Sequence, residues 1–381
     1  MAKKKGDIEH LDFDEYIHAG EPGKRERAYA WRTAIGLQAV DGLQVSDYLR
    51  TTARRNIEGE ITIDEARDLI KTYYQSKTAR EPDDDGKQEA DRVSANITRI
   101  LSRQTLDFSA HGFIALHRRI FEGVLKHAGE VRKYDITKKE WVLRGDTVNY
   151  LNFEDVRRAL DYDISQERTF NYTGLSVDDM IAHISKFVAG LWQIHPFGEG
   201  NTRTTAVFTI QYLRSIGFDV SNDLFAENSW YFRNALVRAN YKNVVKGIDY
   251  TPIYLERFFR NLLLGEQNEL RNRYLLIHSP ENIQDHTPLS TPSSTPSSFV
   301  GTNNENIVRL VKAMGMAHMS VKEMLQAVGL KDRKNFLEYS LHPAIKEGFV
   351  ALLYPQKPRH PRQKYLLTVK GLALYNELKK E

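Results

Sequence analysis

His195-Pro196-Phe197-Gly198-Glu199-Gly200-Asn201-Thr202-Arg203-Thr204 is the stretch that decides the fold around it. An apolar run at helical spacing precedes it over residues 181–194, and another follows it over residues 207–216. Pro196 cannot donate a backbone hydrogen bond and disfavours a helical residue before it, so we expect the first helix to end near His195. The two glycines allow a tight turn, after which the second helix begins.

This turn has the composition of an anion-binding site. A glycine-containing turn that opens onto a helix N-terminus presents unpaired N–H groups and the positive end of the helix dipole. Arg203 adds a charged fork for the same anion, and Glu199 suits a hard divalent cation shared with phosphate oxygens. His195 can accept a proton at neutral pH. These residue types indicate transfer of a phosphorus-containing group from a nucleotide; the alternative is a capped helix–turn–helix with a packed histidine.

The same residues resemble the signature of the Fic family of nucleotide-dependent transferases, His-x-Phe-x-(Asp/Glu)-Gly-Asn-Gly-Arg-x-x-Arg. Most members attach AMP to a hydroxyl of a target protein, and Fic proteins often modify themselves. The resemblance implies a mainly α fold, a Fic-type helical bundle with a β-hairpin flap. It also implies ATP as co-substrate, Mg²⁺ as cofactor and a protein as partner, and it leaves a homodimer open.

Carried over by position, the resemblance gives each motif residue a role. His195 would deprotonate the target hydroxyl, and Glu199 would hold Mg²⁺ against the α- and β-phosphates. The groups that would bind the nucleotide phosphates are Gly198, Gly200, Asn201, the Thr202 amide and Arg203. Thr202 replaces the second motif glycine, and Ala206 stands where the second arginine usually holds the γ-phosphate. Ala206 keeps two alternatives open: a donor such as UTP or GTP, or a non-catalytic nucleotide-binding regulator.

Length and composition favour a two-domain globular protein. The chain has 381 residues and a mass of 44.0 kDa, and 41% of its residues are hydrophobic. No apolar run reaches about 18 residues, so we expect no transmembrane helix. The basic start leads into no apolar segment, which argues against a secretory signal. Without cysteine there is no disulfide framework or thiol nucleophile. A cytoplasmic protein fits best.

Residues 1–89 are predicted to form an N-terminal helical region. Within it, Asn56-Ile57-Glu58-Gly59 resembles the inhibition motif of Fic proteins, (Ser/Thr)-x-x-x-Glu-(Gly/Asn), with Arg54 at the Ser/Thr position. The resemblance implies a self-inhibited member in which Glu58 obstructs the γ-phosphate site, because a carboxylate repels a triphosphate in a low-dielectric cleft. The alternative is a helix C-terminal turn with a solvated acid.

Residues 90–265 are predicted to form the Fic catalytic domain. β-forming residues over 131–150 flank the turn signal Arg144-Gly145-Asp146 and predict a short hairpin beside the site. In Fic proteins this flap lays an extended target segment across the site by strand addition; a hairpin that only covers the core is the alternative. The segment around Tyr231 resembles the Fic segment that closes the nucleotide pocket, so Tyr231 would border adenine unless it belongs to the core.

The C-terminal part is predicted to be a separate unit. Residues 266–304 comprise a helix end and a flexible Ser/Thr/Pro-rich linker, and 305–381 read as three helices and two strands. This order predicts a winged helix-turn-helix, similar to those appended to many bacterial Fic proteins. Fourteen Lys/Arg against seven Asp/Glu give it a charge of +7, leaving −3 for residues 1–304. The positions that could contact DNA phosphates are Lys331, Arg333, Lys334, Lys357, Arg359 and Arg362; a protein partner or a solvated basic loop are the alternatives.

Overall fold

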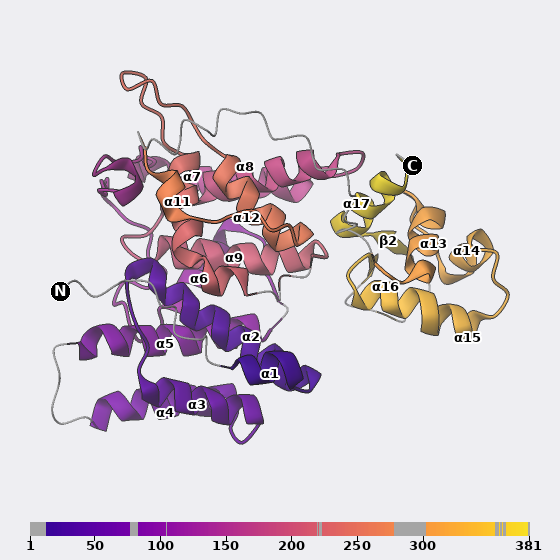
Figure 1. Cartoon of the computed structure of the whole chain (residues 1–381), viewed down its shortest axis with the longest axis horizontal. Coiled ribbons are helices and arrows are strands. Elements are labelled where there is room, and N and C mark those ends of the chain that lie inside the picture. Colours follow the sequence, from indigo (N-terminus) through magenta and orange to yellow (C-terminus); the bar gives the residue numbers. More distant parts are fainter. Residues whose placement is uncertain are drawn as a thin grey trace.

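The computed structural model describes residues 13–76, 83–103, 105–218, 220, 223–277, 302–354, 358, 360 and 363–379. Regular structure in these ranges is almost entirely helical, which confirms the predicted mainly α fold (Figure 1). The helices up to α12 gather into one bundle, and a smaller C-terminal unit lies beside it (Figure 1). None of the described helices is both long and apolar enough to cross a membrane.

The N-terminal region forms a helical layer with its own apolar core. Its elements are α1 (Asp14–Ala19), α2 (Pro22–Gly36), η1 (Leu37–Asp41), α3 (Asp47–Glu58) and α4 (Ile63–Ser76). Ser46 caps α3 by accepting from the Leu49 N–H. Trp31 of α2 is completely buried and donates its indole N–H to Asn56 of α3 at 2.9 Å. This layer therefore has an apolar core that is separate from the core of the rest of the bundle.

Helix α5 (Asp84–Leu101) joins this layer to the central helices, because it packs against α2, α4 and α6. Its buried Asp91 accepts hydrogen bonds from Ser46 and from the Tyr74 hydroxyl. Asp84 is only 5% exposed and lies in the first turn of α5, where the helix dipole favours an acidic side chain.

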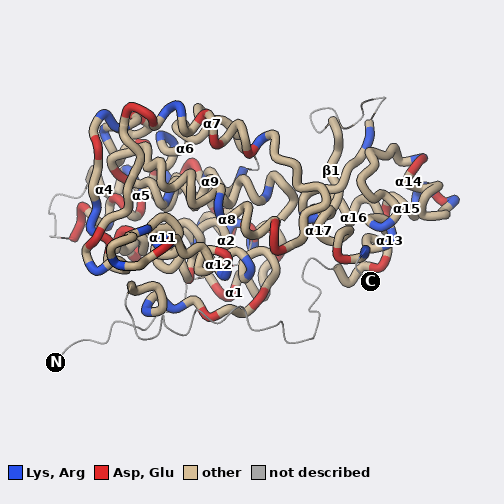
Figure 2. The backbone as a smooth tube through the Cα atoms, turned by 90° about the horizontal axis from the view of Figure 1, so that it is seen from above, with Lys and Arg blue, Asp and Glu red and all other residues tan. Residues whose placement is uncertain are grey.

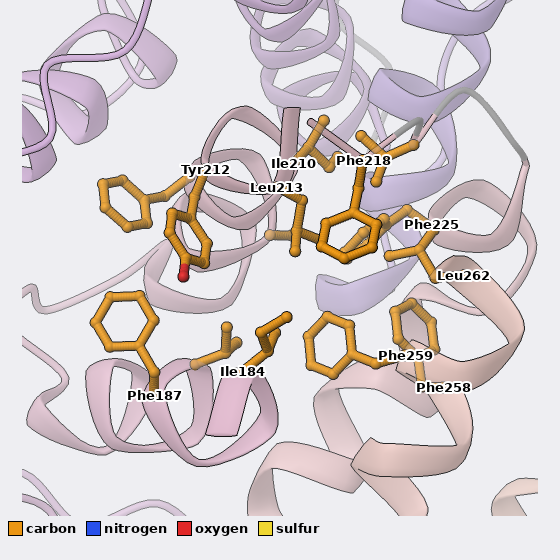
Figure 3. Close-up of a cluster of buried hydrophobic side chains, with 14 of the residues drawn as sticks. Ile184, Phe187, Ile210, Tyr212, Leu213, Phe218, Phe225, Phe258, Phe259 and Leu262 are labelled. Atoms are coloured by element: carbon orange, nitrogen blue, oxygen red, sulfur yellow. The ribbon is translucent and has the colours of Figure 1, made fainter. Parts of the chain in front are cut away.

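The central bundle surrounds a buried helix. Its members are α6 (Ala110–Ile120), α7 (Val156–Thr169), α8 (Val177–Ile194), α9 (Asn201–Ser215), α10 (Leu224–Glu227), α11 (Ser229–Ala239) and α12 (Ile253–Leu264). Residues 201–213 of α9 are all buried, so α9 occupies the centre. Figure 3 shows side chains of α8, α9 and α12 meeting in one apolar cluster, among them Ile184, Leu213 and Phe259. The boundaries of α8 and α9 confirm the expected helix end near His195 and the restart after the glycines.

The expected β-hairpin at residues 129–152 is not formed. This segment contains no β-strand, although Glu140 N–H donates to the Asp146 carbonyl at 2.9 Å and Arg144 turns with a φ of 52°. Between them lies the 3-10 turn η2 (Trp141–Leu143), whose Val142 and Leu143 are buried. Because the tip packs into the core, its residues cannot pair as a regular ladder. We call residues 131–150 the flap.

The segment after α12 is packed, not free. Residues 266–277 include the turn η4 (Asn272–Leu275), with Leu275 and Ile277 buried, and the Ile277 N–H donates to the Val142 carbonyl at 2.9 Å. The predicted linker thus begins later than residue 266. Most of the predicted Ser/Thr/Pro-rich stretch, residues 278–301, lies outside the described residues. The turn η3 (Phe153–Asp155) leads from the flap into α7.

The C-terminal unit has the predicted order of three helices followed by two strands. Its elements are α13 (Glu305–Met314), α14 (Val321–Ala327), α15 (Arg333–Phe336), the π turn η6 (Leu337–Leu341), α16 (His342–Lys346), β1 (Val350–Leu352) and β2 (Tyr365–Leu367). The strands pair antiparallel, with Val350 opposite Leu367, and Met319 forms a bridge to Tyr365. A final helix, α17 (Val369–Leu378), was not predicted. Figure 2 shows Lys and Arg interspersed with Asp and Glu over the described residues.

Candidate active site

His195 terminates α8 in a backbone conformation that few residues other than glycine adopt. Its φ and ψ are 49° and 58°, in the left-handed region. Such strain persists only where the surroundings enforce it. Arg132 does so: its Nε donates to the His195 carbonyl at 2.8 Å, and its N–H donates to the Pro196 carbonyl at 2.9 Å. The guanidinium also binds the carbonyls of Tyr134 and Leu151, so a buried arginine fixes the turn.

The His195 imidazole is a buried, neutral base with one open nitrogen. The side chain is 2% exposed, and Nδ1 lies 3.2 Å from the Trp192 carbonyl oxygen. A carbonyl only accepts, so Nδ1 carries the hydrogen and Nε2 keeps its lone pair. Nε2 is buried, and among the described residues it has no hydrogen-bond partner. Burial, and secondly the charge of Lys138, hold the pKa of His195 well below its usual value.

Beyond the turn, the N-terminus of α9 faces the site with free backbone donors. Gly200 has a φ of 71°, and the first intrahelical bond runs from the Thr204 N–H to the Gly200 carbonyl at 3.0 Å. The N–H groups of the first turn therefore lack intrahelical acceptors. The Asn201 amide closes the loop by bonding both backbone groups of Phe197, at 3.0 and 2.7 Å. The Asn201 side chain thus serves the loop, and the backbone remains for an anion.

The hydroxyl of Thr202 is also used within the protein, as it accepts the Trp192 indole N–H at 2.9 Å. Its N–H is left in the first turn of α9, which agrees with the amide role expected for this position. Gly198 lies beneath the flap, and a Cβ at this position would come within 2.7 Å of the Tyr134 hydroxyl. A side chain at 198 would therefore collide with the flap.

Arg203 is 3% exposed, and its guanidinium has partners on each nitrogen. Nε lies 2.8 Å from an Asp41 carboxylate oxygen, Nη1 donates to Gln38 at 2.9 Å, and Nη2 donates to Glu89 at 2.8 Å. The same group lies 4.8 Å from the centre of the Phe121 ring. All the polar partners come from the N-terminal region and α5. The predicted contact of Arg203 with the triphosphate would require these partners to be exchanged.

The carboxylate of Glu199 is exposed, whereas its backbone is fixed. His117 Nδ1 accepts the Gly129 N–H at 2.8 Å, so Nε2 carries the hydrogen and donates to the Glu199 carbonyl at 3.2 Å. The His117 ring stacks on Phe197 at 3.7 Å, and burial lowers the pKa of His117 to about 4. Neutral His117 therefore stabilises the motif loop through its contacts with Glu199 and Phe197.

Within the described ranges, no three His, Asp or Glu side chains gather as a complete metal site. Mg²⁺ commonly takes only one or two protein carboxylates and completes its shell with substrate phosphates and water. An exposed Glu199 beside the open helix terminus fits that pattern. The chain can thus supply one ligand of a shared site.

The flap carries a polar network that reaches the base. Glu140 is 1% exposed; it lies 2.7 Å from Arg233 Nη1 of α11 and accepts the Tyr150 hydroxyl at 3.0 Å. The Tyr150 ring in turn lies 4.3 Å from the His195 ring. Glu140 therefore links α11 to the wall of the imidazole pocket.

Tyr231, expected beside adenine, lies in the core. It is 1% exposed, and its hydroxyl lies 3.2 Å from the Tyr254 carbonyl, to which it donates. Its neighbour Trp230 is half-buried, with the Arg233 guanidinium 5.2 Å from its ring. On α11, Trp230 and Arg233 are therefore more accessible than Tyr231.

Glu58 is not brought to the motif in this structure. It ends α3 before Gly59, which has a φ of 87°, and its exposed carboxylate lies 2.5 Å from the Lys24 ammonium. The Lys24 ammonium and then the Tyr16 hydroxyl hold the pKa of Glu58 below its usual value. The carboxylates that reach a motif arginine are those of Asp41 and Glu89.

In the C-terminal unit, two of the three described basic positions share a groove of about 930 Å³. Lys331 and Arg333 line it with Lys322 and His360, over an apolar floor that includes Leu325 and Tyr365. Lys334 is exposed on α15 but is not part of the lining. The remaining predicted positions, Lys357, Arg359 and Arg362, lie outside the described residues.

Sequence reasoning missed Arg132, His117 and Glu140. Arg132 and Glu140 are charged residues among β-forming neighbours, a pattern that favours a solvated strand face. His117 is a lone histidine on a helix, which gave no signal. Only the fold shows that all three are buried against the motif.

Comparison with known proteins agrees with this site. The family model described as "Fic/DOC family" matches residues 107–213, which include the whole motif. The chain contains a Fic/DOC domain. A second model, "Filamentation induced by cAMP protein Fic-like, C-terminal domain", matches residues 305–368. The first match thus covers α6 to most of α9, and the second covers α13 to β2.

Two individual proteins are similar to this chain. Protein adenylyltransferase VbhT of Bartonella schoenbuchensis is 26% identical over 108 residues, which is 28% of this chain and 21% of that protein. The chain therefore matches about a fifth of that relative's length. A crystal structure of a Fic family protein from Desulfovibrio desulfuricans G20 has a TM-score of 0.44 and 16% identity, covering 91% of this chain and 88% of that one.

Proposed function

We propose that the protein is a Fic-type protein adenylyltransferase, which transfers AMP from Mg-ATP to a hydroxyl side chain of a target protein. The observation that carries the proposal is the unpartnered Nε2 of the buried His195 imidazole beside the open N-terminus of α9. A buried nitrogen without a partner costs free energy unless a ligand completes it. The similarity to an enzyme named protein adenylyltransferase supports AMP as the transferred group.

In the proposed reaction, the target hydroxyl donates its hydrogen to Nε2 of His195 while its oxygen attacks the α-phosphorus. A new phosphorus–oxygen bond forms, the bond from the α-phosphorus to the bridging oxygen breaks, and pyrophosphate leaves. The hydrogen on Nδ1, held by the Trp192 carbonyl, keeps the lone pair on Nε2. The N–H groups at the start of α9 bind the developing negative charge on the α-phosphate.

Glu199 is the residue that would hold Mg²⁺, which supplies charge neutralisation for the phosphates when bound. Gly200 allows the tight turn before α9, because any Cβ there would meet the Phe121 ring at 2.2 Å. The adenine would lie toward α11, along Trp230 and Arg233. The tip of the flap packs into the core, so the outer edge of the flap would be the part that binds an extended target segment.

The test is intact-mass analysis of the wild type after incubation with Mg²⁺ and each nucleoside triphosphate, because self-modification requires no known target. We expect a gain of one AMP unit with ATP, absent in His195→Ala and retained in His111→Ala, whose histidine is exposed on α6. A mass gain with UTP or GTP only would show that the donor nucleotide is not ATP. Equal labelling of His195→Ala and wild type would remove His195 as the base.

Self-inhibition through Glu58 stays a prediction. In this structure the carboxylate pairs with Lys24, so inhibition would require the end of α3 to leave that contact. Glu58→Gly is expected to raise labelling if the brake exists. Lys24→Met is the matched variant. It removes the partner of the Glu58 carboxylate, so an inhibitory Glu58 would then lower labelling.

A second candidate function is that of a nucleotide-binding regulator whose C-terminal unit binds DNA. The basic groove around Lys331 and Arg333 favours it, as does the pairing of Arg203 with Asp41 and Glu89. Phosphate contacts make affinity fall steeply with salt. Salt-dependent binding of a duplex that Lys331→Ala/Arg333→Ala abolishes, together with no transfer under any condition, would favour the regulator over the enzyme.

A further inference from the structure

Among the described residues, three arginines around the site have identified partners. Arg132 binds backbone carbonyls beneath the motif, Arg203 is paired with Asp41 and Glu89, and Arg233 is paired with Glu140. These contacts satisfy each guanidinium within the protein. Lys138 of the flap is a further cation of the site, and its surroundings differ from those of the three arginines.

Lys138 is half-buried, and within the described residues its ammonium has neither a hydrogen bond nor a carboxylate within 4.0 Å. Its backbone is fixed, because its N–H donates to the Thr147 hydroxyl oxygen at 3.3 Å and the Glu140–Asp146 bond follows directly. Lys138 lies two residues before Glu140, which pairs with Arg233 and with the Tyr150 hydroxyl beside the His195 ring. Its charge interacts with those of Asp41, Glu140, Glu199 and Arg233 and lowers the pKa of His195. The Lys138 ammonium is not one of the buried polar atoms without a partner, so it keeps contact with water, and an anionic ligand can take the place of that water.

The chain also lacks a cation on α9 where one would be expected to face the phosphates. Position 206 is occupied by Ala206, which is completely buried, and the only arginine of the α9 first turn is Arg203 with its carboxylate partners. A cationic side chain for the triphosphate, in addition to the Mg²⁺ that Glu199 would hold, would therefore come from another element.

We propose that Lys138 is a substrate-binding residue that holds a phosphate of the nucleotide donor against the N-terminus of α9. This proposal rests on the proposed function for the identity of the donor. A lysine suits the task, because its ammonium binds a phosphate as a point charge without a fixed fork geometry. The anion would supply the counter-charge that the protein does not.

The experiment measures calorimetric affinities for Mg-ATP and for adenosine in the His195→Ala background, which prevents turnover. Lys138→Met is expected to weaken Mg-ATP binding at least about tenfold, the loss of one charge-assisted contact. Lys139→Met, the exposed neighbour, is the matched control and should bind as the parent does. Lys138→Arg should recover most of the affinity, and adenosine binding should be the same in all variants.

Equal Mg-ATP affinities of the Lys138→Met and Lys139→Met variants would overturn the proposal, as would an equal loss for ATP and adenosine. Lys138→Gln replaces Lys138→Met if the latter has a lowered urea midpoint. Binding that depends on Lys138 in a protein that never transfers AMP would refute the proposed function but keep this site. A parent protein that binds no nucleoside triphosphate would refute both.

Discussion

Two helix ends in this chain carry the residues that the sequence marks as functional, and they are built differently. Helix α8 ends at His195 and α3 ends before Gly59, each with a left-handed residue at its terminus. At the first, a buried arginine binds the carbonyls of the turn and the imidazole is 2% exposed. At the second, the carboxylate of Glu58 is exposed and pairs with Lys24.

The difference shows which observations point to a ligand. An exposed ion pair contributes little and needs nothing further, because water solvates both groups. A buried nitrogen without a partner does need one, since the protein has paid its desolvation without a hydrogen bond in return. The α8 end is therefore organised for a ligand, and the α3 end is satisfied as it stands.

The largest expected difference between the two helix ends comes from substituting the glycine in each turn. Gly200→Ala should destabilise the fold by about 4 kcal/mol, because the left-handed backbone and the Phe121 ring at 2.2 Å both oppose a Cβ. Gly59→Ala should cost about 1 kcal/mol, because the nearest atom of another residue, in Arg27, is 3.8 Å away. Urea unfolding of both variants gives the comparison, and equal losses would contradict it.

Removing the arginine that holds the His195 turn should be nearly as severe. Arg132→Met leaves several buried carbonyl oxygens without donors, so we expect a loss of about 3 kcal/mol in the free energy of unfolding. Lys133→Met changes the same charge one residue later at an exposed position and should change stability little. If the two variants unfold at the same urea concentration, the contacts of Arg132 with the backbone carbonyls do not stabilise the His195 turn.

Acid should weaken the buried site through His117. Burial lowers the pKa of His117 to about 4 in the folded chain, whereas the ordinary value of 6.5 applies to the unfolded chain. The unfolded state therefore binds the proton first. Stability is fully present above pH 6.5 and falls as the pH decreases toward 4, by about 2 kcal/mol between pH 6.5 and 5. Unfolding curves of His117→Asn should show a smaller pH dependence than those of His111→Ala; identical slopes would remove His117 as the source.

The smallest effect is expected at the α3 end. Glu58→Gln removes an exposed ion pair and should leave the urea midpoint within experimental error. Because Glu58 pairs with Lys24 and Arg203 pairs with Asp41 and Glu89 in this structure, a rise in labelling would require the end of α3 to move. A large rise in labelling would show that the end of α3 reaches the motif in solution, and it would turn the inhibitory prediction into the better description.

Helix periodicity and the Pro196 and glycine signals predicted the ends of α8 and α9, because these depend on local backbone chemistry. They also predicted the turn at Arg144, where φ is 52°. The flap failed as a hairpin because Val142 and Leu143 bury their side chains in a core that the local pattern does not specify.

The site was predictable only in part. The motif placed His195, Glu199 and Gly200 in one turn, since their spacing is local. Partners distant in sequence could not be predicted, and so the pairing of Arg203 with Asp41 and Glu89 appears only in the folded chain. Tyr231 shows the same limit, because an aromatic residue at helical spacing fits a pocket or a core equally well.

The most direct test of the central claim is the protonation state of His195 itself. Long-range proton–nitrogen correlation spectra of histidine-labelled protein at pH 7, assigned with His195→Ala, report on both ring nitrogens. We predict a pyrrole-type Nδ1 and a pyridine-type Nε2, that is, a neutral ring with its lone pair open to the site. A protonated Nε2, in the other neutral tautomer or in the cation, would contradict the account.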